Sequence, residues 1–192
     1  MSTTTASAAG IASPLRRLYF VRFAFALVWA GLLFTTASTL NPVSVTLLVL
    51  YPIFDVAAAV VDARSSRSKA PGLYANMVIS LVAAAGLAIA ATAGIPGILR
   101  VWGAWAVVAG IVQLIVGIGR RRTLGGQWPM ILSGALSAVA GTTFILQAAQ
   151  DGAGLSTMAG YAAVGGIFFL VSALRLDHAA KNPPAQGQQS FR

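Results

Sequence analysis

The sequence predicts an all-α integral membrane protein with six transmembrane helices, arranged as three repeated antiparallel hairpins. Three observations lead to this fold class. The chain of 192 residues is 57% hydrophobic and only 9% charged, whereas about a quarter of the residues in a typical soluble domain are charged. The apolar residues form six stretches, each near the length of about 20 residues that a membrane-spanning helix needs. Basic residues recur in every second connection between these stretches.

Polar residues set the limits of the six predicted helices. Asn41 and Pro42 predict the start of the second helix, because asparagine caps helix N-termini and proline is tolerated at the first helical position. The first apolar stretch is longer than the core of a signal peptide and five more follow, so we expect it to be a retained helix. The predicted helices cover residues 18–39, 42–61, 73–93, 98–118, 128–147 and 155–174.

The positions of the basic residues predict the topology. The connections after the first, third and fifth helices are short and contain no Lys or Arg, and all but two of the 13 basic residues lie at the opposite helix ends. Because the cytoplasmic flanks of membrane helices are enriched in Lys and Arg, we expect both termini in the cytoplasm. The net charge of +9 is then a topology signal, and no nucleic-acid partner is expected.

A period of about 55 residues relates the hairpins, since Leu18, Leu73 and Trp128 occupy equivalent positions. Each repeat has two helices and therefore the same orientation, which disfavours an inverted-repeat transporter. The predicted organisation is a disordered cytoplasmic N-terminal tail (residues 1–17), a six-helix transmembrane domain (18–174, with repeats 18–72, 73–127 and 128–174) and a cytoplasmic C-terminal tail (175–192).

Three charged residues, Arg22, Asp55 and Asp62, form a predicted intramembrane polar cluster in the first repeat. A central Arg or Asp costs about 2.5 to 3.5 kcal/mol to insert, so each needs a reason to be there. Asp62 lies two helical turns from Asp55 on the same face, and Arg22 can reach either carboxylate. The first interpretation is a structural ion pair that joins the first two helices, and the second is a protonatable Asp55 in a proton or cation pathway.

Other charged residues are expected nearer the membrane surfaces. Arg100 is a candidate partner for Asp151 at the outer side, with plain exposure to water as the alternative. A run of three arginines follows the fourth helix, and it either anchors the topology or contacts anionic lipid head groups on the cytoplasmic face. This run consists of Arg120, Arg121 and Arg122.

Aromatic and small residues supply packing predictions. Trp102 and Trp105 are expected in the interfacial aromatic belt, whereas Trp29 lies too deep for a belt and is expected in the core. Small residues at intervals of four, such as Ser137 and Gly141, let helix backbones approach closely. They are expected to pack inside the bundle, with a homo-oligomer or membrane-partner contact as the alternative.

No catalytic or metal-binding motif is present. The chain has no cysteine and a single histidine, and it lacks a phosphate-binding loop, a zinc spacing and a Ser/His/Asp set. No enzyme activity, catalytic residue, metal or cofactor is therefore expected.

Residues 109–122 (AGIVQLIVGIGRRR) and residues 125–141 (GGQWPMILSGALSAVAG) carry a family resemblance. They resemble the HdeD-type acid-resistance membrane proteins, small six-span bacterial proteins with repeated hairpins. Pro42 and Pro96 in the first two outer turns follow that pattern, whereas the third outer turn has no proline, and Arg22 and Asp55 lie in the divergent first repeat. The resemblance implies an inner-membrane protein linked to acid or envelope stress, with no catalytic residues to transfer.

Two hypotheses of function follow. The first is a non-enzymatic multi-pass membrane protein that supports stress tolerance through structural or partner interactions. The alternative is a small proton, cation or solute transporter or channel that uses Asp55.

Overall fold

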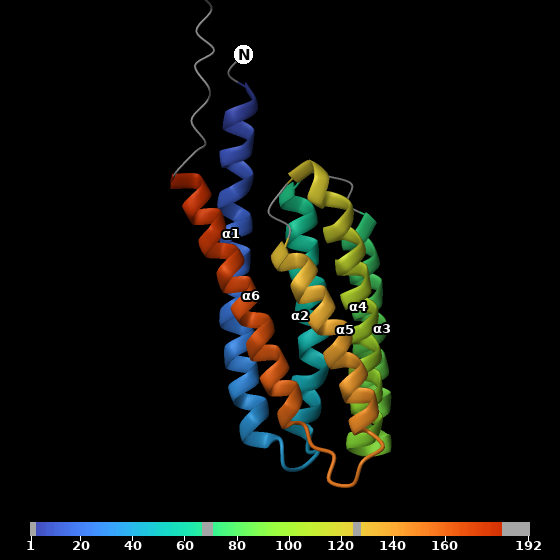
Figure 1. Ribbon diagram of the computed structural model, residues 1–192. Coiled ribbons are helices and arrows are strands. Elements are labelled where there is room, and N and C mark those ends of the chain that lie inside the picture. Colours follow the sequence, from blue (N-terminus) through green and yellow to red (C-terminus); the bar gives the residue numbers. More distant parts are fainter. Residues whose placement is uncertain (1–2, 67–70, 125–127, 182–192) are drawn as a thin grey trace, which may run out of the picture.

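The computed structural model describes residues 3–66, 71–124 and 128–181, and this part of the chain forms six α-helices that run alongside one another (Figure 1). One 3₁₀ turn, η1, joins α3 directly to α4. The bounds are α1 Thr3–Thr36, α2 Pro42–Ser66, α3 Pro71–Ala90, η1 Ala91–Ala93, α4 Gly94–Leu124, α5 Trp128–Gln147 and α6 Ser156–Lys181.

The apolar composition of these helices indicates a multi-pass membrane protein. Four helical segments of the described chain are long and apolar enough to cross a membrane: Pro14–Thr36, Pro42–Arg64, Pro71–Val116 and Ser156–His178. The third of these is 46 residues long and contains α3, η1 and α4, while α5 contributes the shorter apolar stretch Ile131–Gln147. The predicted all-helical class is therefore confirmed.

Side-chain and glycine signals set the turns between helices. The Asn41 side-chain oxygen accepts hydrogen bonds from the backbone N–H groups of Val43 and Ser44, both at 3.0 Å, and Pro42 is the first residue of α2. The predicted start of this helix is confirmed. Gly94 turns the chain from η1 into α4 with a φ of +71°, a left-handed conformation that glycine adopts without the steric cost of a side chain.

The N-terminal segment differs from its prediction. Residues 1–17 were expected to be disordered, yet α1 begins at Thr3 and continues without a break into the apolar stretch. The reason is that this segment contains four alanines, strong helix formers, and extends a helix whose nucleation is already complete. At the other end, α6 continues to Lys181, and the rest of the expected C-terminal tail lies outside the described residues.

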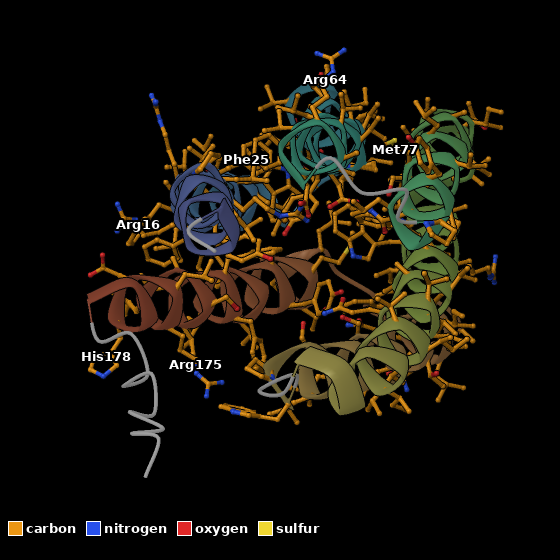
Figure 2. All side chains as sticks on the ribbon, turned by 90° about the horizontal axis from the view of Figure 1, so that it is seen from above. Arg16, Phe25, Arg64, Met77, Arg175 and His178 are labelled. Carbon is orange, nitrogen blue, oxygen red and sulfur yellow. The ribbon has the colours of Figure 1, made fainter. Side chains whose placement is uncertain are left out.

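The six helices close into a ring. The most extensive contacts lie between α4 and α5, between α1 and α6, and between α2 and α3, whereas α5 and α6 touch least. Each of the six helices thus makes its most extensive contact with a helix of a different sequence repeat. Figure 2, a view along the bundle, shows α1 beside α6 and side-chain nitrogen and oxygen atoms in the space between the helices.

The bundle has two different ends. We call the end near which α1 begins and α6 ends (Figure 1) the basic end, because Arg16, Arg64 and Arg175 lie toward it (Figure 2). The opposite end, which holds η1 and the connections 37–41 and 148–155, is the short-turn end. This separation of charge along the bundle agrees with the alternation of basic connections in the sequence.

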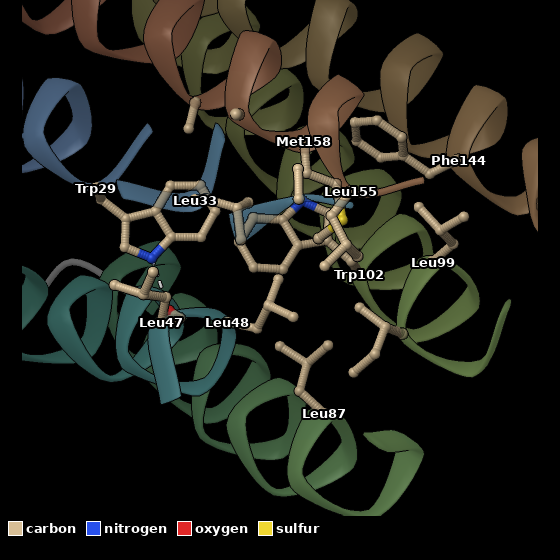
Figure 3. Packing of buried hydrophobic residues seen from close by; sticks show 14 of the residues in the cluster. Trp29, Leu33, Leu47, Leu48, Leu87, Leu99, Trp102, Phe144, Leu155 and Met158 are labelled. Atoms are coloured by element: carbon tan, nitrogen blue, oxygen red, sulfur yellow. Dashed lines mark hydrogen bonds between the residues drawn. The ribbon is translucent and has the colours of Figure 1, made fainter. Parts of the chain in front are cut away.

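An apolar core fills the half of the bundle nearer the short-turn end (Figure 3). It combines large side chains from five helices with less than 2% exposure each, including Leu33, Leu48, Leu87, Trp102 and Met158. Burial of Trp29 in this core confirms its predicted position.

Trp102 and Trp105 correct another prediction, because they are buried in the core rather than placed in an interfacial belt. They fill the centre of the ring because α4 turns this face toward α1 and α2: Trp102 stacks on Trp29 and meets Tyr51. The outer faces of the helices are apolar too, with exposed side chains such as Phe34 and Ile89.

Candidate functional site

A buried carboxylate, Asp55 on α2, is the centre of a polar network inside the ring. It is 8% exposed and accepts hydrogen bonds from three side chains. One carboxylate oxygen pairs with a guanidinium nitrogen of Arg22 on α1. The other oxygen accepts from the Asn76 amide at 2.6 Å and from the Ser80 hydroxyl at 2.9 Å, both on α3. The ion pair between Arg22 and Asp55 that the sequence predicted is thus present in the structure. Two further hydrogen-bond donors, Asn76 and Ser80, also bind the carboxylate.

The network reaches two further helices. The Trp105 indole N–H on α4 donates to the Ser80 hydroxyl at 3.2 Å, which passes the connection from α2 through α3 to α4. The guanidinium of Arg22 lies 4.3 Å from the centre of the Phe169 ring on α6, a cation–π arrangement. Asp55 is therefore linked, directly or through one intermediate residue, to α1, α3, α4 and α6.

Simple helix geometry explains why these residues meet. Asn76 and Ser80 are four residues apart, so both face α2 from adjacent turns of α3. Arg22 projects from α1 toward the same level of α2. Burying one charge alone costs several kcal/mol, and an opposite charge with further hydrogen bonds offsets that cost. The three donors around Asp55 supply this compensation.

An aromatic layer separates the network from the apolar core. Phe25 and Phe54 stack with their ring centres 3.7 Å apart, and Tyr51 lies between Phe25, Trp29 and the two tryptophans of α4. The Trp29 indole N–H donates to the backbone carbonyl of Leu47 at 2.6 Å. Because Phe25 and Tyr51 lie one helical turn from Arg22 and Asp55 toward the short-turn end, the aromatic rings cover the charged pair on that side.

Two buried donors lack partners in the described part of the structure. They are the Nε of Arg22 and the indole nitrogen of Trp102. Arg22 therefore uses one guanidinium nitrogen for Asp55 and keeps another donor uncommitted within the ring. A separate polar contact, from the Tyr161 hydroxyl to the Ser137 hydroxyl at 3.0 Å, joins α6 to α5, the neighbouring pair with the fewest contacts.

The contacts of Asp55 given above do not include Asp62, Arg100 or Asp151. Asp62 lies on α2 toward the basic end and is half-buried, and the ion pair of Arg22 is made with Asp55. Arg100 and Asp151 are both exposed, and the ion pairs between described residues do not include a contact of these two. Two exposed charges gain little by pairing in water, so the alternative of plain exposure describes them better.

The arginine run at the end of α4 has a described backbone only. The helix continues through Arg120, Arg121 and Arg122 to Leu124, and the positions of these three side chains lie outside the described residues.

The structure adds a second ion pair that sequence reasoning missed. Arg16 on α1 pairs with Asp177 on α6, near the basic end of the ring. These residues are far apart in the chain, and no sequence periodicity connects them. Their meeting depends on the closure of the ring by the first and last helices, which the repeat pattern did not predict.

Asn76, Ser80 and Trp105 were also missed as members of the Asp55 network. The available signal was the pair of polar residues one turn apart in an apolar helix, Asn76 and Ser80. Sequence alone related Ser80 only to small residues on its own helix, because the identity of the facing helix was unknown.

The chemistry open to this arrangement is limited. No group of three or more His, Cys, Asp or Glu residues that could hold a metal ion occurs in residues 3–66, 71–124 and 128–181. Both oxygens of Asp55 accept hydrogen bonds, one from Arg22 and the other from Asn76 and Ser80, so a proton or cation that binds there competes with three donors already in place. The network is well built to hold helices in a fixed arrangement.

Comparison of the chain with protein-family models, with curated proteins and with solved structures finds no match.

Proposed function

We propose that this chain is a non-enzymatic, six-span protein of the bacterial inner membrane with both termini in the cytoplasm, and that it acts through structural or partner interactions. The charge pattern supports the orientation, because the basic residues gather toward the end of the bundle where α1 begins and α6 ends. The resemblance of residues 109–141 to HdeD-type proteins supports a role in acid or envelope stress tolerance.

The observation that carries the structural role is the set of three donors that Asp55 binds on three different positions of two neighbouring helices, α1 and α3. A carboxylate in a transport pathway must exchange protons or ions, whereas Asp55 holds Arg22, Asn76 and Ser80 at once and connects five helices through them. Its aromatic cover and the apolar core beyond it fill the path toward the short-turn end. These contacts favour a fixed scaffold over a moving carrier.

The shape of the bundle restricts where a partner can dock. The connections at the short-turn end are brief, so they offer little surface for a large soluble protein. A partner is therefore expected within the membrane, against the exposed apolar faces of the helices, or at the basic end. A homo-oligomer would use the same apolar faces.

Proton flux separates this function from its alternative, a small transporter that uses Asp55. Wild-type protein and the Asp55→Asn variant are reconstituted into liposomes that contain a pH-sensitive dye, and a pH step is applied. A structural protein gives flux no faster than protein-free liposomes in both cases. Proton flux that exceeds the protein-free level in the wild type and disappears in Asp55→Asn would establish the transporter. The buried Nε of Arg22, which has no hydrogen-bond partner in the described structure, would then lie on the path of the proton.

The proposed topology makes its own prediction. Cytoplasmic and extracytoplasmic reporters fused at Ser68, in the second connection, and at Gly152, in the fifth, are expected to give opposite signals, with Ser68 in the cytoplasm. Matched fusions at Arg192 are expected to behave as those at Ser68. Equal signals from Ser68 and Gly152 would contradict six alternating crossings.

A further inference from the structure

Two grooves flank one exposed arginine on α1 near the basic end. The first, of about 530 Å³, lies where α1 meets α6 and is lined by Arg16, Arg17, Phe20, Val21, Ala24 and Asp177. The second, of about 470 Å³, lies where α1 meets α2 and is lined by Pro14, Arg17, Leu18, Val21 and Val61. Both grooves share Arg17 and Val21, which therefore form the ridge between them.

The charges of this surface leave one cation available. Arg16 pairs with Asp177, and these two charges offset each other. Arg17 is exposed, and no ion pair within the described part of the chain includes it. Among the described side chains that line the two grooves, Arg17 is therefore the one cation outside an ion pair, and the guanidinium of Arg16 beside it can also donate hydrogen bonds.

The polar and apolar linings are ordered along the helix axis. Arg16 and Arg17 directly precede the predicted first span, at its end nearer the basic end of the bundle. Val21 lies one helical turn, about 6 Å, further from the basic end, on the same face of α1 as Arg17. Phe20 and Val21 are 38% and 48% exposed, and Val61 on the far side of the second groove is 47% exposed. Charge at the membrane surface thus gives way to open apolar walls toward the membrane interior.

This order matches the chemistry of one class of ligand. A phospholipid has a phosphate at the membrane surface and two acyl chains that run inward from it. A lipid with one net negative charge also matches the single free cation. A soluble anion would leave the apolar walls empty, and a protein helix would not need a charge at the head of two separate grooves.

We propose that these grooves form a binding site for an anionic phospholipid, with the phosphate held by Arg17 and Arg16 and one acyl chain on each side of Val21. This inference goes beyond the proposed function, because it holds whether the bundle is a scaffold or a transporter. It also differs from the head-group contact expected at Arg120–Arg122, since it lies on another helix and includes a place for the acyl chains.

The charge is tested by native mass spectrometry of the full chain in detergent, titrated with phosphatidylglycerol or with phosphatidylcholine. We expect the wild type to retain phosphatidylglycerol preferentially and Arg17→Gln to lower that retention about fivefold, since a basic residue near the surface contributes about that factor. The matched control is Arg64→Gln, because Arg64 is exposed on α2 and points away from the bundle (Figure 2). Retention by this control is expected to equal that of the wild type.

The acyl-chain grooves need a separate test. Ala24→Trp places a large ring in the first groove and is expected to lower retention of both lipids, whereas Arg17→Gln removes only the preference for phosphatidylglycerol. Inorganic phosphate and glycerol phosphate, added at the same concentrations, are expected not to compete, since they lack acyl chains. Equal loss of retention in Arg17→Gln and Arg64→Gln, no lipid preference in the wild type, or displacement of lipid by inorganic phosphate would each overturn the proposal.

Discussion

Replacement of Asp55 by asparagine is expected to lower the free energy of unfolding by about 3 kcal/mol, the cost of removing one partner from a buried ion pair. The variant leaves the guanidinium of Arg22 without its counter-charge inside the ring. It also replaces one of the two accepting oxygens by an NH₂ group, which cannot accept the hydrogen bonds that Arg22, Asn76 and Ser80 donate to the carboxylate. The measurement is the unfolding equilibrium in mixed detergent micelles, followed by tryptophan fluorescence.

A double-mutant cycle isolates the ion pair from the other contacts of Asp55. Arg22→Gln, Asp55→Asn and the double variant are compared, and the double variant is expected to be more stable than the sum of the single losses predicts, by about 0.5 to 3 kcal/mol. The physical reason is that each single variant leaves one charge uncompensated, whereas the double variant leaves none. Strictly additive losses would show that Arg22 and Asp55 act independently.

Asp151→Asn is the matched control for this cycle. It makes the same chemical change at an exposed carboxylate in the last connection of the short-turn end. Its effect on the free energy of unfolding is expected to stay within about 0.5 kcal/mol. A loss as large as that of Asp55→Asn would mean that the effect follows from net charge rather than from the buried network.

Helix-level features could be predicted from the sequence because they depend on local physical chemistry. Long apolar stretches predict helices, because a helix satisfies its backbone hydrogen bonds internally in a membrane. Asn41 and Pro42 predict the start of α2, because asparagine caps the first backbone N–H groups of a helix. Arg22 and Asp55 could be paired because they lie at similar depths on consecutive helices, and a charge at membrane depth needs a partner.

Contacts between distant helices could not be predicted in the same way. In a soluble helix the apolar stripe identifies the buried face, but here the lipid-facing surfaces are as apolar as the core, so hydrophobic periodicity does not reveal which face points inward. The burial of Trp102 and Trp105, the addition of Asn76 and Ser80 to the network, and the Arg16–Asp177 pair all depend on that choice of face. The polarity of a residue in an apolar helix indicated that it needs a partner, but it did not identify the residues on other helices that supply this partner.

The close packing of α4 against α5 depends on glycines, and their replacement gives the second large expected effect. A Cβ atom built on Gly110 would lie 2.6 Å from the Gly134 carbonyl oxygen, and one built on Gly141 would lie 2.5 Å from the Gly103 carbonyl oxygen. Both obstructing atoms belong to the backbone of the neighbouring helix, which cannot move aside as a flexible side chain can. The two glycine pairs therefore set the separation of the two helices that make the most extensive contact in the ring.

Gly110→Ala and Gly141→Ala are each expected to lower the free energy of unfolding by about 1 to 3 kcal/mol, the usual cost of inserting a methyl group into a well-packed contact. Gly160→Ala is the matched control, since Gly160 is exposed on α6 and nothing lies within 4 Å of a Cβ at that position. Because alanine is the better helix former, this control is expected to be neutral or to stabilise by up to about 1 kcal/mol. The same micelle unfolding measurement reports all three variants. A loss of stability in Gly110→Ala and Gly141→Ala without a loss in Gly160→Ala would attribute the effect to helix separation, whereas an unaffected Gly110→Ala would contradict the close approach of α4 and α5.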